Sequence, residues 1–271
     1  MQMETEYCSA TMNYLGGLQT VPVEVSIKNG RLAHHLSWQS NGFELINSKS
    51  AVQNWSNDAE IARVYYDEMS SLARAMTGCD HALVAGHINR NPEQADLHED
   101  YAPIQFVHSD FTDNYGDLLI QRYRQNSAEA AAALASSGIT VEDMARAKRL
   151  LILQFWRNVG PEQMDYPLAF CDAQSVPRAD MHSIHVPNYA GGDFAFDTFA
   201  VAPPPSQDAH DWYVFPNMTR DEAVAFRTFD SKMVATGAPY WTPHSAFLDE
   251  TTGVNAPARR SIEVRATCLF F

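Results

Sequence analysis

The sequence predicts a mainly β fold, a double-sheet jelly roll with helices packed outside the sheets. Short segments with strand-like patterns outnumber the helical segments, and Gly, Pro or Asn residues separate them. Hydrophobic residues make up 45% of the 271 residues, which is enough for one large core. We therefore expect a single domain over residues 1–271, with a helical N-terminal region and a loop insertion around residues 177–211.

In the first half of the chain, strand patterns alternate with one long helix pattern. Strands are predicted over residues 20–27, 42–50 and 81–90. The helix between the second and third of these begins at Asn57, with Glu60 three residues on, and ends at Gly78. The polar segment 91–103, which contains His98, is expected to be a loop.

The second half also mixes strands with short helices. Strands are predicted over residues 151–159, 167–176, 211–216 and 259–271. Helices are predicted over residues 127–138, 141–150 and 220–231. The last helix rests on Thr219 and Glu222, which have the spacing of a capping box. Residues 177–211, with three consecutive prolines and a glycine pair, are expected to be a loop.

The composition limits the partners and the cellular location. The formal net charge of −14 disfavours binding to the phosphate backbone of nucleic acids. There is no apolar run long enough for a membrane span, and the acidic first residues lack the pattern of a signal peptide. The four cysteines lie far apart and are predicted to be free thiols, as in a cytoplasmic protein. A homodimer is expected only because such assemblies are the commonest.

The segment "QFVHSDFTDNYGD", residues 105–117, carries the strongest candidate for chemistry. His108 and Asp110 are two residues apart after an apolar lead-in, so on a strand both side chains point to the same face. A histidine and a carboxylate at this spacing supply two of the three ligands in the facial triad that holds non-haem Fe(II).

His244 is the best candidate for the third ligand among the ten histidines. It lies in "YWTPHSAFLD", before the last predicted strand, and strands that are distant in sequence can be neighbours in a jelly roll. His182 and His185 have no pattern that places them on one face, and we interpret them as ordinary surface histidines.

Arg259 and Ser261 can anchor an acidic co-substrate. They are two residues apart, on one face of the last predicted strand. The arginine fork binds a carboxylate through two parallel hydrogen bonds, and the serine adds a third donor. An oxygenase needs such an anchor for the distal carboxylate of 2-oxoglutarate, because a buried charge without a partner is costly. The alternative is that Arg259 and Arg260 are surface charges that protect an edge strand from aggregation.

Five segments resemble, in their order and spacing, a family of non-haem iron oxygenases of secondary metabolism: "VHSDFT", "PLAFCDAQSV", "WYVFPNMTRDEAVAFRTFDS", "PHSAF" and "RRSIEVR". The family includes fungal AsaB-like hydroxylases and desaturases, gibberellin desaturase and the CmcJ-type subunit linked to cephamycin methoxylation. One segment departs from its pattern, since Gln154 and Phe155 stand in place of Asn and Val, and Asn158 in place of Pro. Gln154 and Trp156 are candidates for contact with the co-substrate if they line the barrel.

The resemblance implies a distorted, cupin-like jelly roll (a double-stranded β-helix). It implies a dioxygenase that uses Fe(II), 2-oxoglutarate and O₂ to oxidise a C–H bond of a small organic molecule. The metal ligands carried over are His108, Asp110 and His244, and the co-substrate anchor is Arg259 with Ser261. Hydroxylation, desaturation, oxidative cyclisation and endoperoxide formation all stay open, because the outcome depends on where the substrate carbon lies.

Two other functions fit the same residues. A cupin-like metal-dependent oxidase or isomerase without 2-oxoglutarate would keep the three ligands but leave Arg259 without a role. An accessory subunit of an oxygenase, as for the CmcJ-type protein, would not need an intact triad. For an enzyme, the long segments 91–103 and 188–199 are the candidate walls of a substrate pocket.

Overall fold

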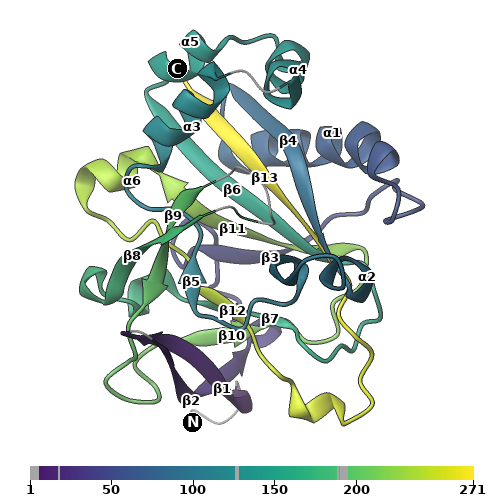
Figure 1. The fold of residues 1–271 in the computed structure, drawn as a ribbon, viewed down its shortest axis with the longest axis vertical. Coiled ribbons are helices and arrows are strands. Elements are labelled where there is room, and N and C mark those ends of the chain that lie inside the picture. Colours follow the sequence, from purple (N-terminus) through teal and green to yellow (C-terminus); the bar gives the residue numbers. More distant parts are fainter. Residues whose placement is uncertain (1–5, 18, 126–127, 188, 190–194) are drawn as a thin grey trace.

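Two β-sheets of unequal size form the body of the molecule (Figure 1). The computed structural model describes residues 6–17, 19–125, 128–187, 189 and 195–271. The larger sheet contains, in spatial order, β1 (Glu6–Gly16), β2 (Gln19–Asn29), β10 (Trp212–Val214), β7 (Leu168–Cys171), β12 (His244–Ala246), β5 (His108–Ser109), β9 (Phe196–Val201) and β8 (Met181–Val186). The smaller sheet contains β3 (Phe43–Asn47), β11 (Glu222–Asp230), β6 (Arg149–Asn158), β13 (Ser261–Phe270) and β4 (His81–Arg90).

The helices lie outside the sheets, as predicted. In the described residues they are α1 (Asp58–Thr77), α2 (Pro92–Ala95), α3 (Tyr115–Arg124), α4 (Ala128–Ser137), α5 (Val141–Arg146) and α6 (Ser231–Thr236). The long helix α1 runs behind β4 in Figure 1 and covers one face of the smaller sheet. Its buried residues Ile61, Tyr65, Met69 and Ala73 are four residues apart and form one apolar stripe. None of the described helices has the length and apolar content needed to cross a membrane.

The centre of the smaller sheet has one apolar face and one polar face. On β13, Ile262 and Val264 pack in the apolar cluster under α1. The residues between and after them, Glu263 and Arg265, point to the opposite face and line a cavity between the two sheets. Gln154 on the neighbouring strand β6 lies directly opposite Arg265 in the register. Polar and charged side chains from the middle of the smaller sheet therefore point into the interior of the protein.

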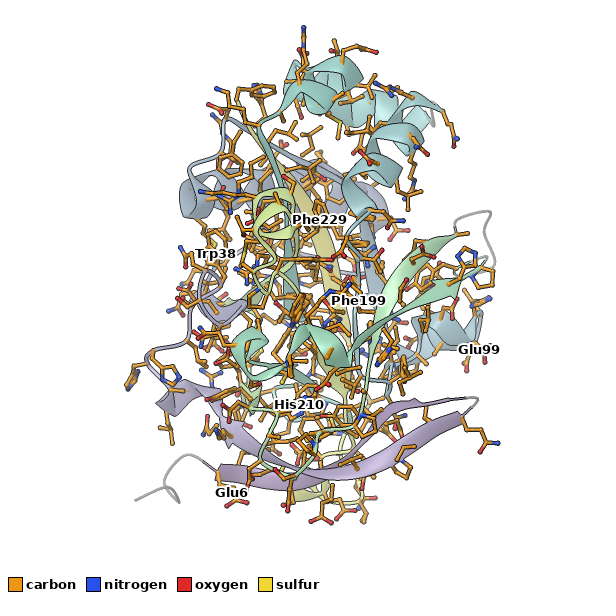
Figure 2. All side chains as sticks on the ribbon, turned by 90° about the vertical axis from the view of Figure 1, so that its left-hand side faces the viewer. Glu6, Trp38, Glu99, Phe199, His210 and Phe229 are labelled. Carbon is orange, nitrogen blue, oxygen red and sulfur yellow. The ribbon has the colours of Figure 1, made fainter. Side chains whose placement is uncertain are left out.

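The N-terminal hairpin of β1 and β2 closes one end of the molecule. Figure 2 shows this hairpin crossing beneath the body, with His210 on the side that faces it. Tyr14 of β1 is fully buried, and its hydroxyl accepts a hydrogen bond from Trp212 Nε1 (2.8 Å) and lies 3.2 Å from His210 Nδ1. The sequence patterns did not predict β1, because its residues alternate weakly between polar and apolar types.

The predicted helix over residues 220–231 is wrong, because Glu222–Asp230 is strand β11. One of the two contacts of a capping box does form there, since the Thr219 amide donates to Glu222 Oε2 (2.8 Å). However, β11 lies between β3 and β6, and nearly all of its residues are buried. Pairing with two neighbouring strands outweighs the local helix signal.

The predicted loop over residues 177–211 is also partly wrong. Two antiparallel strands, β8 and β9, lie within it and form the edge of the larger sheet. Residues 188 and 190–194, in the second predicted wall, lie outside the described residues. The strand predicted over residues 167–176 ends at Cys171, after which the chain turns into a 3₁₀ helix. The polar segment 91–103 contains the short helix α2 and a 3₁₀ turn over Glu99–Tyr101.

We predict that Arg227→Met strongly destabilises the protein. The guanidinium of Arg227 is 1% exposed and donates to four backbone carbonyls, those of Trp38, Gln39, Pro239 and Tyr240, at 2.8–3.1 Å. The variant leaves these carbonyls without donors in the interior, and we expect a loss of about 3–5 kcal/mol in the free energy of unfolding. Urea unfolding measures the loss, with the exposed Arg63→Met as the matched control. Equal midpoints for the two variants would contradict this account.

Candidate functional site

The two predicted histidine ligands face each other on neighbouring strands. Strand β5 pairs with β12, and His108 is directly opposite His244 in the register. The centroids of the two imidazole rings are 4.4 Å apart. Asp110 follows the end of β5 and joins them, so the structure brings His244 to a pair of residues that is remote from it in the sequence.

The three side chains present one ligand atom each to a common point. Asp110 Oδ1 lies 3.5 Å from His108 Nε2 and 3.6 Å from His244 Nε2. One ligand atom of each residue lies within 4.8 Å of the other two. The exposed fractions are 9% for His108, 7% for Asp110 and 3% for His244. Two imidazole nitrogens and one carboxylate oxygen form the donor set of a facial metal triad.

Hydrogen bonds to the backbone orient both imidazole rings. His108 Nδ1 lies 2.7 Å from the carbonyl oxygen of Phe106, and His244 Nδ1 lies 2.9 Å from that of Thr242. A carbonyl can only accept, so Nδ1 carries the proton in each ring and the Nε2 lone pair faces Asp110. Burial, together with the neighbouring His244, lowers the pKa of His108 to about 4, and burial also lowers the pKa of His244. Both rings are therefore neutral at pH 7, which is the form that binds a metal.

Asp110 keeps its negative charge although it is buried. Burial alone would raise its pKa, but the nearby guanidinium of Arg265 and the hydrogen bond from Gln154 hold the pKa well below its usual range. Arg265 Nη2 lies 3.1 Å from Asp110 Oδ2. The sequence patterns did not assign a role to Arg265. The alternation in "RRSIEVR" was a usable signal, because it places Arg265 on the same face of the strand as Arg259.

Arg259 is buried and lines the same cavity. Its side chain lies over the Trp156 ring, 5.9 Å from the centroid, and Nη1 donates to the Tyr166 carbonyl (3.2 Å). Among the described residues, its Nε has no hydrogen-bond partner. Burial, with the nearby Arg90, lowers the pKa of Arg259 to about 9. A buried guanidinium without an anionic partner fits a site for the carboxylate of a small molecule.

Ser261 and Arg260, the residues after Arg259, point to opposite faces, as the strand alternation predicts. Ser261 is 2% exposed and is on the same face of β13 as Arg259 and Glu263. Arg260 instead points outward and forms an ion pair with Glu93, at 2.6 Å. The alternative of two surface arginines is therefore wrong for Arg259.

The cavity that contains the triad has a volume of about 770 Å³. Half of its lining residues are aromatic or aliphatic, and the other half are mainly charged groups and histidines, including charged groups from β4 and β13. Both predicted wall segments contribute to it. The lining residues include Asp100 and Tyr101 from the first segment, Tyr189, Phe196 and Thr198 from the second, and Arg90, Trp156, Arg259, Glu263 and Arg265 from the smaller sheet.

Three histidines of the sequence analysis lie apart from the triad. His98 caps the 3₁₀ turn of the first wall segment by accepting from the Asp100 amide (3.2 Å). His182 and His185 are exposed on the edge strand β8, and His185 pairs with Asp197. Gln154 is on the same face of β6 as Trp156, but it is not one of the residues that line the cavity, and its amide nitrogen donates to Asp110 and to Thr228.

A two-sheet fold that encloses two histidines, an aspartate and a buried arginine is typical of jelly-roll non-haem iron oxygenases. Comparison with known proteins agrees with this class. The chain belongs to the oxidoreductase/YMDC permease-like domain family (YDMC), whose model matches residues 3–269.

The curated relatives carry names from the same class. The hydroxylase/desaturase efuI of Hormonema carpetanum is 30% identical over 87% of this chain and 78% of its own length. The Fe(II)/2-oxoglutarate-dependent dioxygenase nvfI of Aspergillus novofumigatus is 26% identical over 76% of this chain and 66% of its own length. A solved structure of a variant of the iron and alpha-ketoglutarate-dependent endoperoxidase NvfI matches with a TM-score of 0.78 at 20% identity, over 99% of both chains. The predicted family, jelly-roll fold and enzyme class are confirmed.

We predict that the metal-free protein loses stability as the pH falls from about 6.5 towards about 4. In this range the unfolded chain binds a proton at His108 that the folded protein does not bind, so the free energy of unfolding decreases as the pH falls. The shift corresponds to at most about 3 kcal/mol, and His244 acts in the same direction.

Urea unfolding at a series of pH values measures this dependence. His108→Gln is expected to flatten it between pH 6.5 and 4, whereas the exposed His34→Gln serves as the control. A variant that keeps the full pH dependence of the wild type would show that His108 is not the group responsible.

Proposed function

We propose that the protein is an Fe(II)- and 2-oxoglutarate-dependent dioxygenase that oxidises a C–H bond of a small organic molecule in secondary metabolism. The observation that carries the proposal is one cavity that holds both a facial donor set and a buried arginine whose Nε has no partner among the described residues. The names of the curated relatives support the same reaction class and the same cofactors. With O₂, the iron and 2-oxoglutarate supply the oxidising power, and succinate and CO₂ are the co-products.

In this proposal His108, Asp110 and His244 hold the iron. The two rings need no deprotonation at neutral pH, and the carboxylate offsets part of the charge of a divalent ion. If these three groups were its only protein ligands, the iron would keep positions free for the keto-acid group of 2-oxoglutarate and for O₂.

Arg259 anchors the distal carboxylate of the co-substrate in the proposal, with Ser261 as a further donor on the same face. An anion would restore the missing counter-charge beside Arg259, whose pKa is lowered to about 9 by burial. A cupin-like oxidase or isomerase that lacks 2-oxoglutarate gives no reason to bury this charge. An accessory subunit would not need two neutral imidazoles and a carboxylate paired with a guanidinium around one point.

The remaining wall of the cavity is proposed to bind the substrate and to exclude water. A volume of about 770 Å³ is within the range of small-molecule sites. Arg90 connects both wall segments to β4, because it donates to the carbonyls of Asp100 and Ala102 and to the Tyr189 hydroxyl (3.0 Å). The free cysteines, three of them buried, support a reducing cytoplasmic location.

We predict that Arg259→Met weakens the binding of 2-oxoglutarate by roughly 30-fold or more, because a charge-assisted anchor contributes about 2 kcal/mol. The measurement is an anaerobic titration of the Fe(II)-loaded protein with 2-oxoglutarate, followed by the weak visible charge-transfer band of the chelate. Arg260→Met is the matched control, since it removes the neighbouring arginine from a surface ion pair. The control is expected to titrate like the wild type.

The same titration separates the alternatives. Iron binding without the band would favour the oxidase or isomerase without 2-oxoglutarate. If the wild type binds no iron, the accessory-subunit alternative is favoured. Full iron binding by either His108→Ala or His244→Ala would show that the ligand assignment is wrong.

A further inference from the structure

The two carboxylate oxygens of Asp110 have different surroundings. Oδ1 faces the Nε2 atoms of His108 and His244 at 3.5 and 3.6 Å. Oδ2 faces the smaller sheet, where it accepts hydrogen bonds from Gln154 Nε2 and from Arg265 Nη2, the latter at 3.1 Å. One oxygen therefore points to the common ligand point, and the other is already bonded within the protein.

The two donors are held rigidly in one place. Gln154 and Arg265 are cross-strand neighbours at the centre of the smaller sheet. Gln154 is fully buried, and its amide nitrogen also donates to Thr228 Oγ1 (2.9 Å), which fixes the direction of the amide. Arg265 lies over the Phe111 ring, 5.3 Å from the centroid, and 3.2 Å from Glu263 Oε1. Each donor is therefore held by a further contact besides its hydrogen bond to Asp110.

We propose that Gln154 and Arg265 are positioning residues. Their hydrogen bonds to Oδ2 keep this oxygen away from the metal, so that Asp110 binds the metal through Oδ1 alone. The inference rests on the proposed function, because it assumes that the triad binds a metal. A carboxylate that bound through both oxygens would occupy a fourth position on the ion. The ion would then lack one of the three positions that the keto-acid group and O₂ need.

Metal affinity alone cannot test this role. Loss of the Arg265 cation strengthens the attraction of the site for a divalent ion. Loss of the hydrogen bonds that orient the Asp110 carboxylate weakens the binding of the same ion. The number of water ligands on the bound metal is the better readout, because it reports directly how many positions the protein leaves open.

The test uses Mn(II) alone, with the bound waters counted by water-proton relaxation. Wild-type protein is expected to keep three exchangeable waters on the bound ion. The double variant Gln154→Leu with Arg265→Met is expected to keep two, so the inner-sphere relaxation falls by about a third. The matched control is Arg260→Met. It removes an arginine from a surface ion pair next to β13 but leaves both donors to Asp110 in place.

Each outcome decides the proposal. Three waters in the wild type and the control, with two in the double variant, support it. Three waters in all of these proteins would overturn it, and so would two waters in the wild type, a result that does not depend on whether the double variant folds. No Mn(II) binding by the wild type would instead overturn the proposed metal site itself.

Discussion

The pairing of the short strand β5 with β12 is the contact on which the candidate site depends. Strand β5 contains two residues, yet it places His108 opposite His244, and a slip of β5 by one residue would turn the His108 side chain to the other face. Bonds from several segments fix its position. The Thr198 hydroxyl donates to the Ser109 carbonyl (2.9 Å), the Thr242 amide donates to Ser109 Oγ (3.2 Å), and β9 pairs with its other edge. The core around the site therefore sets the geometry of the three ligand groups before any metal is bound.

The charges in the cavity show how buried ionisable groups are accommodated. Asp110 and Glu263 share the Arg265 guanidinium, and burial raises the pKa of Glu263, which reduces the cost of placing two acidic groups beside one cation. The imidazoles avoid the cost of charge because burial lowers their pKa. Arg259 has no carboxylate partner among the described residues, its buried Nε has no hydrogen-bond partner among them, and its side chain lines the same cavity. A dianionic co-substrate and a divalent metal ion together would complete this arrangement with little change in net charge, which is why the proposal joins the two.

Residue spacing was sufficient to predict much of the site but only part of the fold. The same-face rule for strands connects His108 with Asp110 and Arg259 with Ser261, and the structure brings the first pair to His244. The capped helix α1 and the alternating strand β13 were predictable because local patterns and tertiary packing agree there. Strand β11 was not predictable, because its helix signal is local, whereas the two neighbouring strands that determine its structure are remote in sequence. The role of Gln154 and Arg265 was also hidden, since it depends on a contact between the two sheets.

The most direct test of the proposed site is a crystal structure of the protein with Fe(II) and 2-oxoglutarate, prepared without O₂ and recorded at the iron absorption edge. We expect one anomalous peak between His108 Nε2, His244 Nε2 and Asp110 Oδ1, with the distal carboxylate of the co-substrate against Arg259. An iron peak bound by other residues would contradict it, and so would a co-substrate whose distal carboxylate lies away from Arg259.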